Sequence, residues 1–141
     1  DIIIAGPECK IFSNLQYTWI GRKWTDKTHL EEEQKKNSIY INKTIEIIEY
    51  FNPKYYFIEN PLYSAIWNYV ENENYLNDFI LVDYCAFGFS YNPKHPLRLG
   101  ANSKQFREQR PNIQKPDNTT LLQRYSYPIK LLDYFFQDII N

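Results

Sequence analysis

Short apolar runs alternate with longer amphipathic stretches along this chain. The first run, Asp1–Ala5, ends at a Gly-Pro pair, and the second, Lys54–Glu59, is followed by Asn60 and a proline. Apolar runs of this length between turn residues are typical of buried strands. The same reasoning predicts a third strand over Phe79–Phe87 and a further strand or hairpin segment over Pro93–Asn102.

The pattern between the first two strands is helical. Ile41, Ile45 and Ile48 recur at helical spacing, and Phe51 extends the stripe. Thr25 or Asp26 can cap the start of this helix, and an Asn-Pro pair at 52–53 is suited to end it. The other segments are expected to be an aromatic loop (11–24), a short helix (62–70), a polar loop (103–120) and a closing helix (129–140).

Strands that alternate with helices predict an α/β fold with a parallel sheet, built as one domain over residues 1–141. Ligands of such sheets gather at the carboxyl ends of the strands. Cys9 follows the first predicted strand and Glu59 ends the second. We therefore expect these two side chains to lie near the same edge of the sheet.

The amino-acid composition says more about the cellular location of the protein than about its function. The formal net charge is −1, so contact with nucleic acid would depend on a local basic cluster. Two cysteines are too few for a disulfide framework and lack the spacing of a metal site, which favours an intracellular location. The chain has no apolar run of the roughly 20 residues that span a bilayer, and no metal site is expected.

A thiol and a carboxyl at one sheet edge are suited to paired chemistry. The thiolate is the nucleophilic form of cysteine, and a neighbouring carboxylic acid can donate a proton to whatever the sulfur attacks. A cysteine after a strand is more often structural, however, and a glutamate at a strand end is usually solvated or a cap. The sequence around both residues decides between these interpretations.

The chain resembles the cytosine-5 DNA methyltransferase family in three ordered segments. The stretch from Asp1 to Ser13 (DIIIAGPECKIFS) is similar to the strand and nucleophile loop of that family. Tyr56–Pro61 (YFIENP) looks like its second signature, a strand that ends in Glu-Asn, in the form of a phage-like and mobile-element branch. Residues 84–88 (YCAFG) and 94–102 (KHPLRLGAN) resemble later segments of that branch.

The resemblance implies a catalytic mechanism. Cys9 adds to C6 of a cytosine that has left the DNA helix, while Glu59 protonates N3, and C5 then takes a methyl group from S-adenosylmethionine. Asn60 orients Glu59 or the adjacent backbone, and Arg98 holds the cytosine carbonyl or the Glu59 carboxylate. The catalytic set is then Cys9, Glu59, Asn60 and Arg98, with Pro7 at the cofactor and with DNA contacts at Lys94, Lys104, Arg107 and Arg110.

The chain also departs from the family pattern. Glu8 replaces the proline that precedes the nucleophile, and a neighbouring acid raises the pKa of a thiol. No G-x-G motif occurs among the 4 glycines, so we expect a partial Rossmann-like methyltransferase sheet without its cofactor-binding first half. That half would lie upstream or in a second polypeptide. The alternatives are a catalytically inactive remnant that serves as a binding or assembly module, and an unrelated α/β protein.

Overall fold

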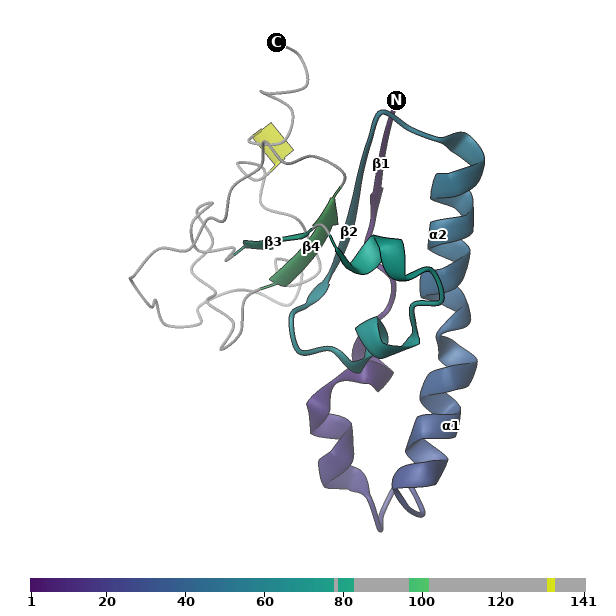
Figure 1. The fold of residues 1–141 in the computed structure, drawn as a ribbon. Helices are drawn as coiled ribbons and strands as arrows, with labels where there is room; N and C mark the ends of the chain where they lie inside the picture. The colour runs from purple at the N-terminus through teal and green to yellow at the C-terminus, as the bar shows by residue number, and fades with distance from the viewer. Residues whose placement is uncertain (78, 83–96, 102–131, 134–141) are drawn as a thin grey trace, which may run out of the picture.

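The computed structural model describes residues 1–77, 79–82, 97–101 and 132–133. These residues form a four-stranded sheet with helices beside it (Figure 1). The order of the strands across the sheet is β1-β2-β4-β3, so the strand that comes last in the sequence lies between two earlier ones. The strands are β1 (Ile2–Ala5), β2 (Tyr55–Pro61), β3 (Phe79–Val82) and β4 (Leu97–Ala101).

The sheet confirms the α/β prediction for its first half and corrects it for the second. β1 and β2 pair in parallel, from Ile2 opposite Tyr55 to Ala5 opposite Ile58, with two helices between them in the chain. β4, however, pairs antiparallel with both β2 and β3. The expectation of an all-parallel sheet was therefore wrong. A run of apolar residues shows that a strand is buried but does not show its direction.

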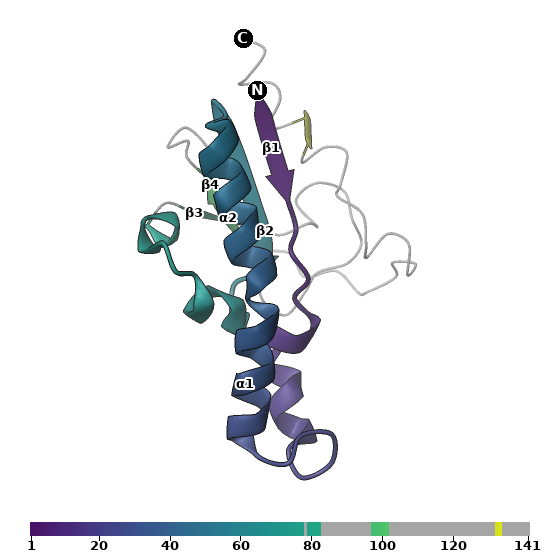
Figure 2. The same cartoon turned by 90° about the vertical axis from the view of Figure 1, so that its right-hand side faces the viewer.

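Two helices, and not the single predicted one, connect β1 to β2. They are α1 (Lys27–Asn37) and α2 (Ile39–Phe51), and they follow one another along one side of the molecule (Figure 2). Asp26 is the N-cap, as expected, because its carboxylate accepts a hydrogen bond from the His29 amide at 2.8 Å. The break falls at Ser38, whose hydroxyl donates to the Lys35 carbonyl at 2.7 Å, a local bond that competes with regular helix geometry.

The core lies between α2 and β2. Ile41, Ile45 and Ile48 are buried, as their spacing predicts, and pack in one cluster with Ile58 of β2. Phe51 was expected to extend this stripe but is 65% exposed. The reason is its position at the end of α2, where Asn52 turns the chain in the left-handed conformation at φ 43° before Pro53.

Short 3-10 helices fill the space beyond the end of β1. The segment predicted as a loop contains η1 (Lys10–Phe12) and η2 (Asn14–Trp19), which lie beside α1 in both ribbon views. The predicted helix after β2 is the 3-10 helix η3 (Ala65–Tyr69), and η4 (Glu73–Leu76) follows it. Phe12 is 1% exposed and joins the core cluster, so this segment is packed against the rest of the fold.

Several predictions fall outside the described residues. They are the end of the third strand, the polar loop, Cys85, and the closing helix except for residues 132 and 133. None of the helices in the described part of the chain has the length and apolar character that crossing a bilayer requires.

Candidate active site

The parallel pairing of β1 with β2 brings the two signature segments together. The last register pair is Ala5 opposite Ile58. The next residues on one side are Gly6 to Cys9, and on the other side Glu59 and Asn60. The segment from Pro7 to Ile11, which we call the Cys9 loop, therefore begins beside the Glu-Asn pair, at the carboxyl end of β1.

Asn60 fastens the start of the Cys9 loop to β2. Its side-chain amide donates a hydrogen bond to the carbonyl oxygen of Pro7 at 2.8 Å, across 53 residues of sequence. The Asn60 side chain is 1% exposed, and its Oδ1 atom is buried without a hydrogen-bond partner among the described residues. An exchange of donor for acceptor at this amide would thus leave the Pro7 carbonyl unpaired in a buried place.

Cys9 is a half-buried free thiol at the start of η1. Its carbonyl accepts a hydrogen bond from the Phe12 amide at 3.0 Å, which closes the first turn of that short helix. Burial raises the pKa of the thiol, and the negative charge of Glu59 raises this pKa further. A hydrogen bond from the backbone amide of residue 9 acts in the opposite direction, and exposed Glu8 adds a further upward contribution to the pKa.

Glu59 is a partly buried carboxyl with an unusual acidity. Burial raises its pKa from the ordinary value of 4.5 to about 7. At neutral pH the side chain is therefore present both as carboxylic acid and as carboxylate. A group with its pKa near the working pH is well suited to give a proton and take it back.

Glu59 contributes to the acidity of the thiol. Burial, and after it the negative charge of Glu59, raises the pKa of Cys9. The coupling has a direct chemical consequence. When Glu59 is protonated it no longer opposes ionisation of the thiol, so the acid form of Glu59 and the thiolate form of Cys9 favour each other.

The remaining predicted site residues are placed only in part. The backbone of Arg98 lies in β4 opposite Asn60 of β2, whereas its side chain is outside the described part of the structure. Pro7 lies in the Cys9 loop, where its carbonyl accepts from Asn60. The four residues predicted to contact DNA, Lys94, Lys104, Arg107 and Arg110, all lie outside the described residues.

Two buried glutamines near the Cys9 loop were missed by the sequence analysis. Gln16 of η2 is 8% exposed and Gln34 of α1 is 0% exposed. A signal for Gln34 existed, because it stands four residues after Leu30 and seven before Ile41, on the buried stripe of the helical pattern. A polar side chain at such a position needs a hydrogen-bond partner in the interior.

A shallow hollow of about 360 Å³ adjoins the Cys9 loop on the α2 side. It is lined by Ala5, Gly6, Pro7 and Glu8 of the loop region, and by Tyr40, Lys43, Thr44 and Ile47 of α2. These side chains could form one wall of a site for a cofactor. The described residues supply neither a glycine loop nor a second wall, so they do not by themselves fit S-adenosylmethionine.

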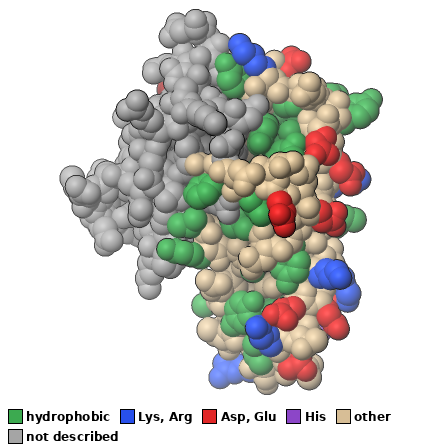
Figure 3. Space-filling model, in the orientation of Figure 1, with side chains coloured by type: hydrophobic (Ala, Val, Ile, Leu, Met, Phe, Trp, Pro, Cys, Tyr) green, Lys and Arg blue, Asp and Glu red, His purple; other side chains and the backbone are tan. Residues whose placement is uncertain are grey.

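Charge is mixed on the helical side of the molecule. In Figure 3 acidic and basic side chains are interspersed down the side where α1 and α2 lie. Three Lys-Glu ion pairs belong to this surface, and each is exposed and local to its helix. Isolated pairs of this kind contribute little to stability, and the described part of this face does not offer the uniform positive field that attracts nucleic acid. No cluster of three possible metal ligands occurs among the described residues.

Comparison with known proteins gives one clear similarity. No protein-family model matches the chain, and no solved structure matches it. The chain is 34% identical over 89 residues to a protein of Frog virus 3 (isolate Goorha) named "Probable DNA (cytosine-5)-methyltransferase". The matched region is 62% of this chain but 39% of the viral protein, so more than half of the relative lies outside the alignment. The chain is thus similar to part of a viral protein whose name, a probable cytosine-5 methyltransferase, is that of the family which the Cys9 and Glu59 segments resemble.

Proposed function

We propose that this chain carries the nucleophile side of a DNA cytosine-5 methyltransferase. The observation that supports this most directly is geometric: the parallel pairing of β1 with β2 and the hydrogen bond from Asn60 to the Pro7 carbonyl bring the Cys9 loop beside Glu59, 50 positions from Cys9 in the sequence. The similarity to the viral protein supports the same class of reaction. In this proposal the substrate is a cytosine turned out of the DNA stack, because its ring atoms are inaccessible within the duplex.

The two side chains have complementary roles in the proposed reaction. The Cys9 thiolate forms a bond to C6 of the cytosine, and Glu59 in its acid form gives its proton to N3 as electron density moves through the ring. C5 becomes nucleophilic and takes the methyl group that S-adenosylmethionine supplies. Loss of the C5 proton to a base then breaks the bond from Cys9 to C6, and Glu59 regains its proton from N3.

The acidity of Glu59 supports this division of roles. An ordinary carboxyl is fully ionised at pH 7 and has no proton to give, whereas a pKa of about 7 keeps much of Glu59 protonated. Protonated Glu59 also removes the charge that holds the pKa of Cys9 up. Binding of a base that accepts a hydrogen bond from the Glu59 acid would therefore assist ionisation of the thiol.

Asn60 and Arg98 complete the proposed catalytic group. Asn60 fixes the Cys9 loop to β2 through the Pro7 carbonyl, which keeps the sulfur near Glu59. The resemblance assigns Arg98 to the cytosine carbonyl or the Glu59 carboxylate. Its backbone lies on the strand next to β2, opposite Asn60. The DNA backbone would meet the basic residues Lys94, Lys104, Arg107 and Arg110.

The fold proposed for the whole enzyme is a Rossmann-like methyltransferase sheet. The described strands would form one half of it, next to the part that holds the cofactor. Pro7 and the hollow beside it would then form one wall of the cofactor site, with the other wall on a segment or chain that these residues do not include. The relative carries its additional length in a single polypeptide, which favours a segment of the same chain.

Trapping of a covalent intermediate tests the proposal. DNA that contains 5-fluorocytosine is incubated with the protein and S-adenosylmethionine, because fluorine at C5 cannot leave as the proton does and the adduct persists. We expect a protein-DNA adduct that resists denaturant and is absent in Cys9→Ala. Cys85→Ala is the matched control and keeps the adduct. An adduct that survives in Cys9→Ala contradicts the proposal, as does the absence of an adduct when the segment that completes the cofactor site is supplied with the wild-type chain.

One observation favours a second candidate, a methyltransferase-fold module without catalysis. Burial, Glu59 and Glu8 all raise the pKa of Cys9, which keeps the thiol protonated in the absence of substrate. A module of this kind would bind DNA without forming an adduct. Retention of unmodified DNA by the wild-type protein, equal in Cys9→Ala, distinguishes it from the enzyme.

A further inference from the structure

The far end of the Cys9 loop is held by the two glutamines that the sequence analysis missed. The side-chain amide of Gln16 donates a hydrogen bond to the carbonyl of Lys10 at 3.0 Å, and that of Gln34 donates to the carbonyl of Ile11 at 3.0 Å. Lys10 and Ile11 directly follow the nucleophile. Both carbonyls belong to the short helix η1, where the Lys10 carbonyl also accepts from the Ser13 amide at 3.4 Å. The side-chain donors from η2 and α1 therefore tie this helix to the rest of the fold.

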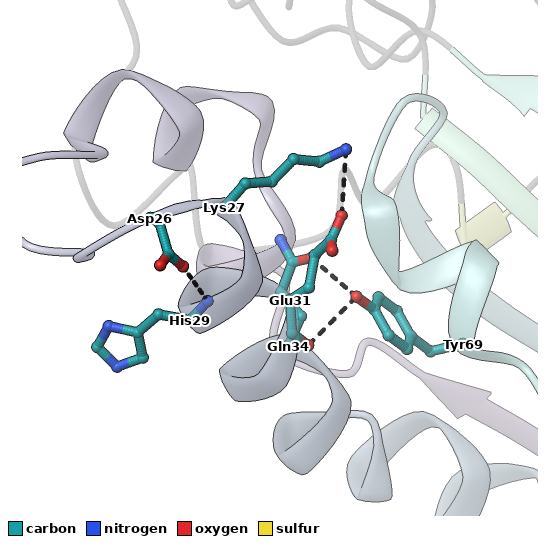
Figure 4. A network of polar contacts seen from close by, with 6 residues as sticks. All are labelled: Asp26, Lys27, His29, Glu31, Gln34 and Tyr69. Atoms are coloured by element: carbon teal, nitrogen blue, oxygen red, sulfur yellow. Dashed lines mark hydrogen bonds and ion pairs between the residues drawn. The ribbon is translucent and has the colours of Figure 1, made fainter.

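Each glutamine is itself oriented by a donor behind it. The indole N–H of Trp24 donates to Gln16 Oε1 at 3.1 Å, and the hydroxyl of Tyr69 donates to Gln34 Oε1 at 3.1 Å. Figure 4 shows Tyr69 reaching Gln34 and the backbone carbonyl of Glu31 at the same end of α1. The oxygen of each glutamine amide must face the donor, and its nitrogen must face the backbone carbonyl. Only one orientation of the amide makes both hydrogen bonds.

Together with Asn60, the glutamines supply three carboxamide donors to one short loop. Asn60 holds the carbonyl of Pro7, two residues before the nucleophile, and the glutamines hold the carbonyls one and two residues after it. The three donors belong to β2, η2 and α1, and each side chain is nine-tenths or more buried. The backbone on both sides of Cys9 is therefore fixed by groups that solvent cannot easily replace.

We propose that Gln16 and Gln34 are positioning residues that hold the sulfur of Cys9 beside Glu59. The inference rests on the proposed function only in taking Cys9 as the nucleophile. Neither glutamine touches the reacting atoms in this scheme, and each acts through the backbone of the Cys9 loop. Such support matters because a reacting group displaced by about 1 Å can lose roughly a hundredfold in rate.

The test follows the reactivity of Cys9 in a Cys85→Ala background. The rate of alkylation by iodoacetamide is measured against pH, without DNA or cofactor, in wild type, Gln34→Leu and Gln16→Leu. Each substitution removes one hydrogen bond to the Cys9 loop, which should expose the sulfur to water and move it away from the charge of Glu59. We expect the alkylation rate at pH 8 to rise roughly threefold or more in both variants, through a larger thiolate fraction.

Two control variants separate positioning from general stability. Ile48→Val removes one buried methylene from α2 and should lower the melting temperature without a change in the alkylation rate. Tyr69→Phe removes the hydroxyl behind Gln34 but keeps the ring that packs on Phe12. It should have a smaller effect than Gln34→Leu, because the bond to Ile11 survives.

A second measurement uses the 5-fluorocytosine DNA adduct. Both glutamine variants should form the adduct more slowly and react faster with iodoacetamide. A loss of stability alone, measured below the melting temperature, does not change the two rates in opposite directions. If neither variant alters the alkylation of Cys9, the positioning role is wrong. If alkylation rises as expected but wild type forms no adduct when the segment that completes the cofactor site is supplied, the proposed function is wrong and the positioning role of the glutamines is retained. Should Gln34→Leu not fold, Gln16→Leu carries the same comparison.

Discussion

Asn60 donates its side-chain hydrogen bond to the carbonyl of Pro7 at 2.8 Å and so joins the second signature segment to the first. The bond is partly buried, with its donor on the buried Asn60, and it crosses from β2 to the loop that carries the proposed nucleophile. A geometric link between two segments that the resemblance treats as separate motifs gives a physical reason for both to be present: one supplies the sulfur and the other holds it in place.

Replacement of Asn60 by aspartate tests this link. The aspartate side chain would keep the size of the asparagine but would present an acceptor to the Pro7 carbonyl, which leaves that buried carbonyl unpaired. We expect Asn60→Asp to lower the free energy of unfolding by about 1–3 kcal/mol, the usual cost of a buried unsatisfied group. Urea denaturation measures the change. Asn14→Asp, at an exposed position, is the matched control, and an equal effect of both variants would contradict the role of Asn60.

The raised pKa of Glu59 predicts how stability depends on pH. The pKa is higher in the folded protein, about 7, than the ordinary 4.5, so the folded state binds the proton more tightly. This group's contribution is complete below pH 4.5 and is lost as the pH rises through 7. From the shift, the loss is at most about 3 kcal/mol.

The corresponding experiment compares wild type with Glu59→Gln across this range. Urea denaturation between about pH 4.5 and about pH 8 should show a decline for wild type that is absent or much reduced in Glu59→Gln. The difference between the two curves isolates Glu59 from other groups that titrate. Parallel curves would show that Glu59 ionises with an ordinary pKa.

The first two strands and their parallel pairing could be predicted, because both are apolar runs that end in turn residues. The catalytic roles of Cys9 and Glu59, which follow these strands, stay a prediction. The direction of β4 could not be predicted, because strand direction depends on long-range pairing that a local pattern does not encode. The hydrogen bond from Gln16 to the Cys9 loop could not be predicted either, because the partners of Gln16 are a backbone carbonyl and a tryptophan eight residues away.

The break between α1 and α2 shows a different limit. The buried stripe continues from Leu30 and Gln34 across Ser38 to Ile41, so periodicity alone predicted one helix. The break falls at Ser38, whose hydroxyl donates a hydrogen bond to a carbonyl three residues earlier. Serine competes for backbone partners in this way only in some helices, and its presence in the sequence does not decide the outcome.

The coupling between Cys9 and Glu59 can be measured as a shift in thiol titration. Burial and then the charge of Glu59 raise the pKa of Cys9. Glu59→Gln removes the second contribution, so the pH at which iodoacetamide alkylation reaches half its maximum should fall. The measurement is made in a Cys85→Ala background. Glu46→Gln, on the exposed side of α2, is the matched control and should leave the titration unchanged. A Glu59→Gln titration identical to wild type would mean that the two groups do not interact.

The same substitution should act differently on the proposed reaction. Glutamine at position 59 cannot give a proton to N3, so Glu59→Gln should form the 5-fluorocytosine adduct at least roughly a hundredfold more slowly, in line with the loss of a general acid. Faster alkylation combined with a slower adduct would separate the two roles of Glu59, the electrostatic one toward Cys9 and the chemical one toward the base. An adduct rate that stays within a fewfold of wild type would remove Glu59 from the proposed mechanism.

Glu8 offers the last test, because it raises the pKa of Cys9 from an exposed position. Glu8→Gln should shift the alkylation midpoint to lower pH, but by less than Glu59→Gln, since Glu8 is the smallest of the contributions to this pKa. Salt should distinguish the two residues. An exposed charge is screened at distances near the Debye length, about 10 Å at 0.1 M ionic strength and about 3 Å at 1 M. The difference between wild type and Glu8→Gln should therefore shrink at about 1 M salt, whereas the difference between wild type and Glu59→Gln should largely persist, because Glu59 is shielded from solvent. If both differences vanish together at high salt, Glu59 acts on Cys9 through solvent and the enclosed pair that the mechanism requires is absent.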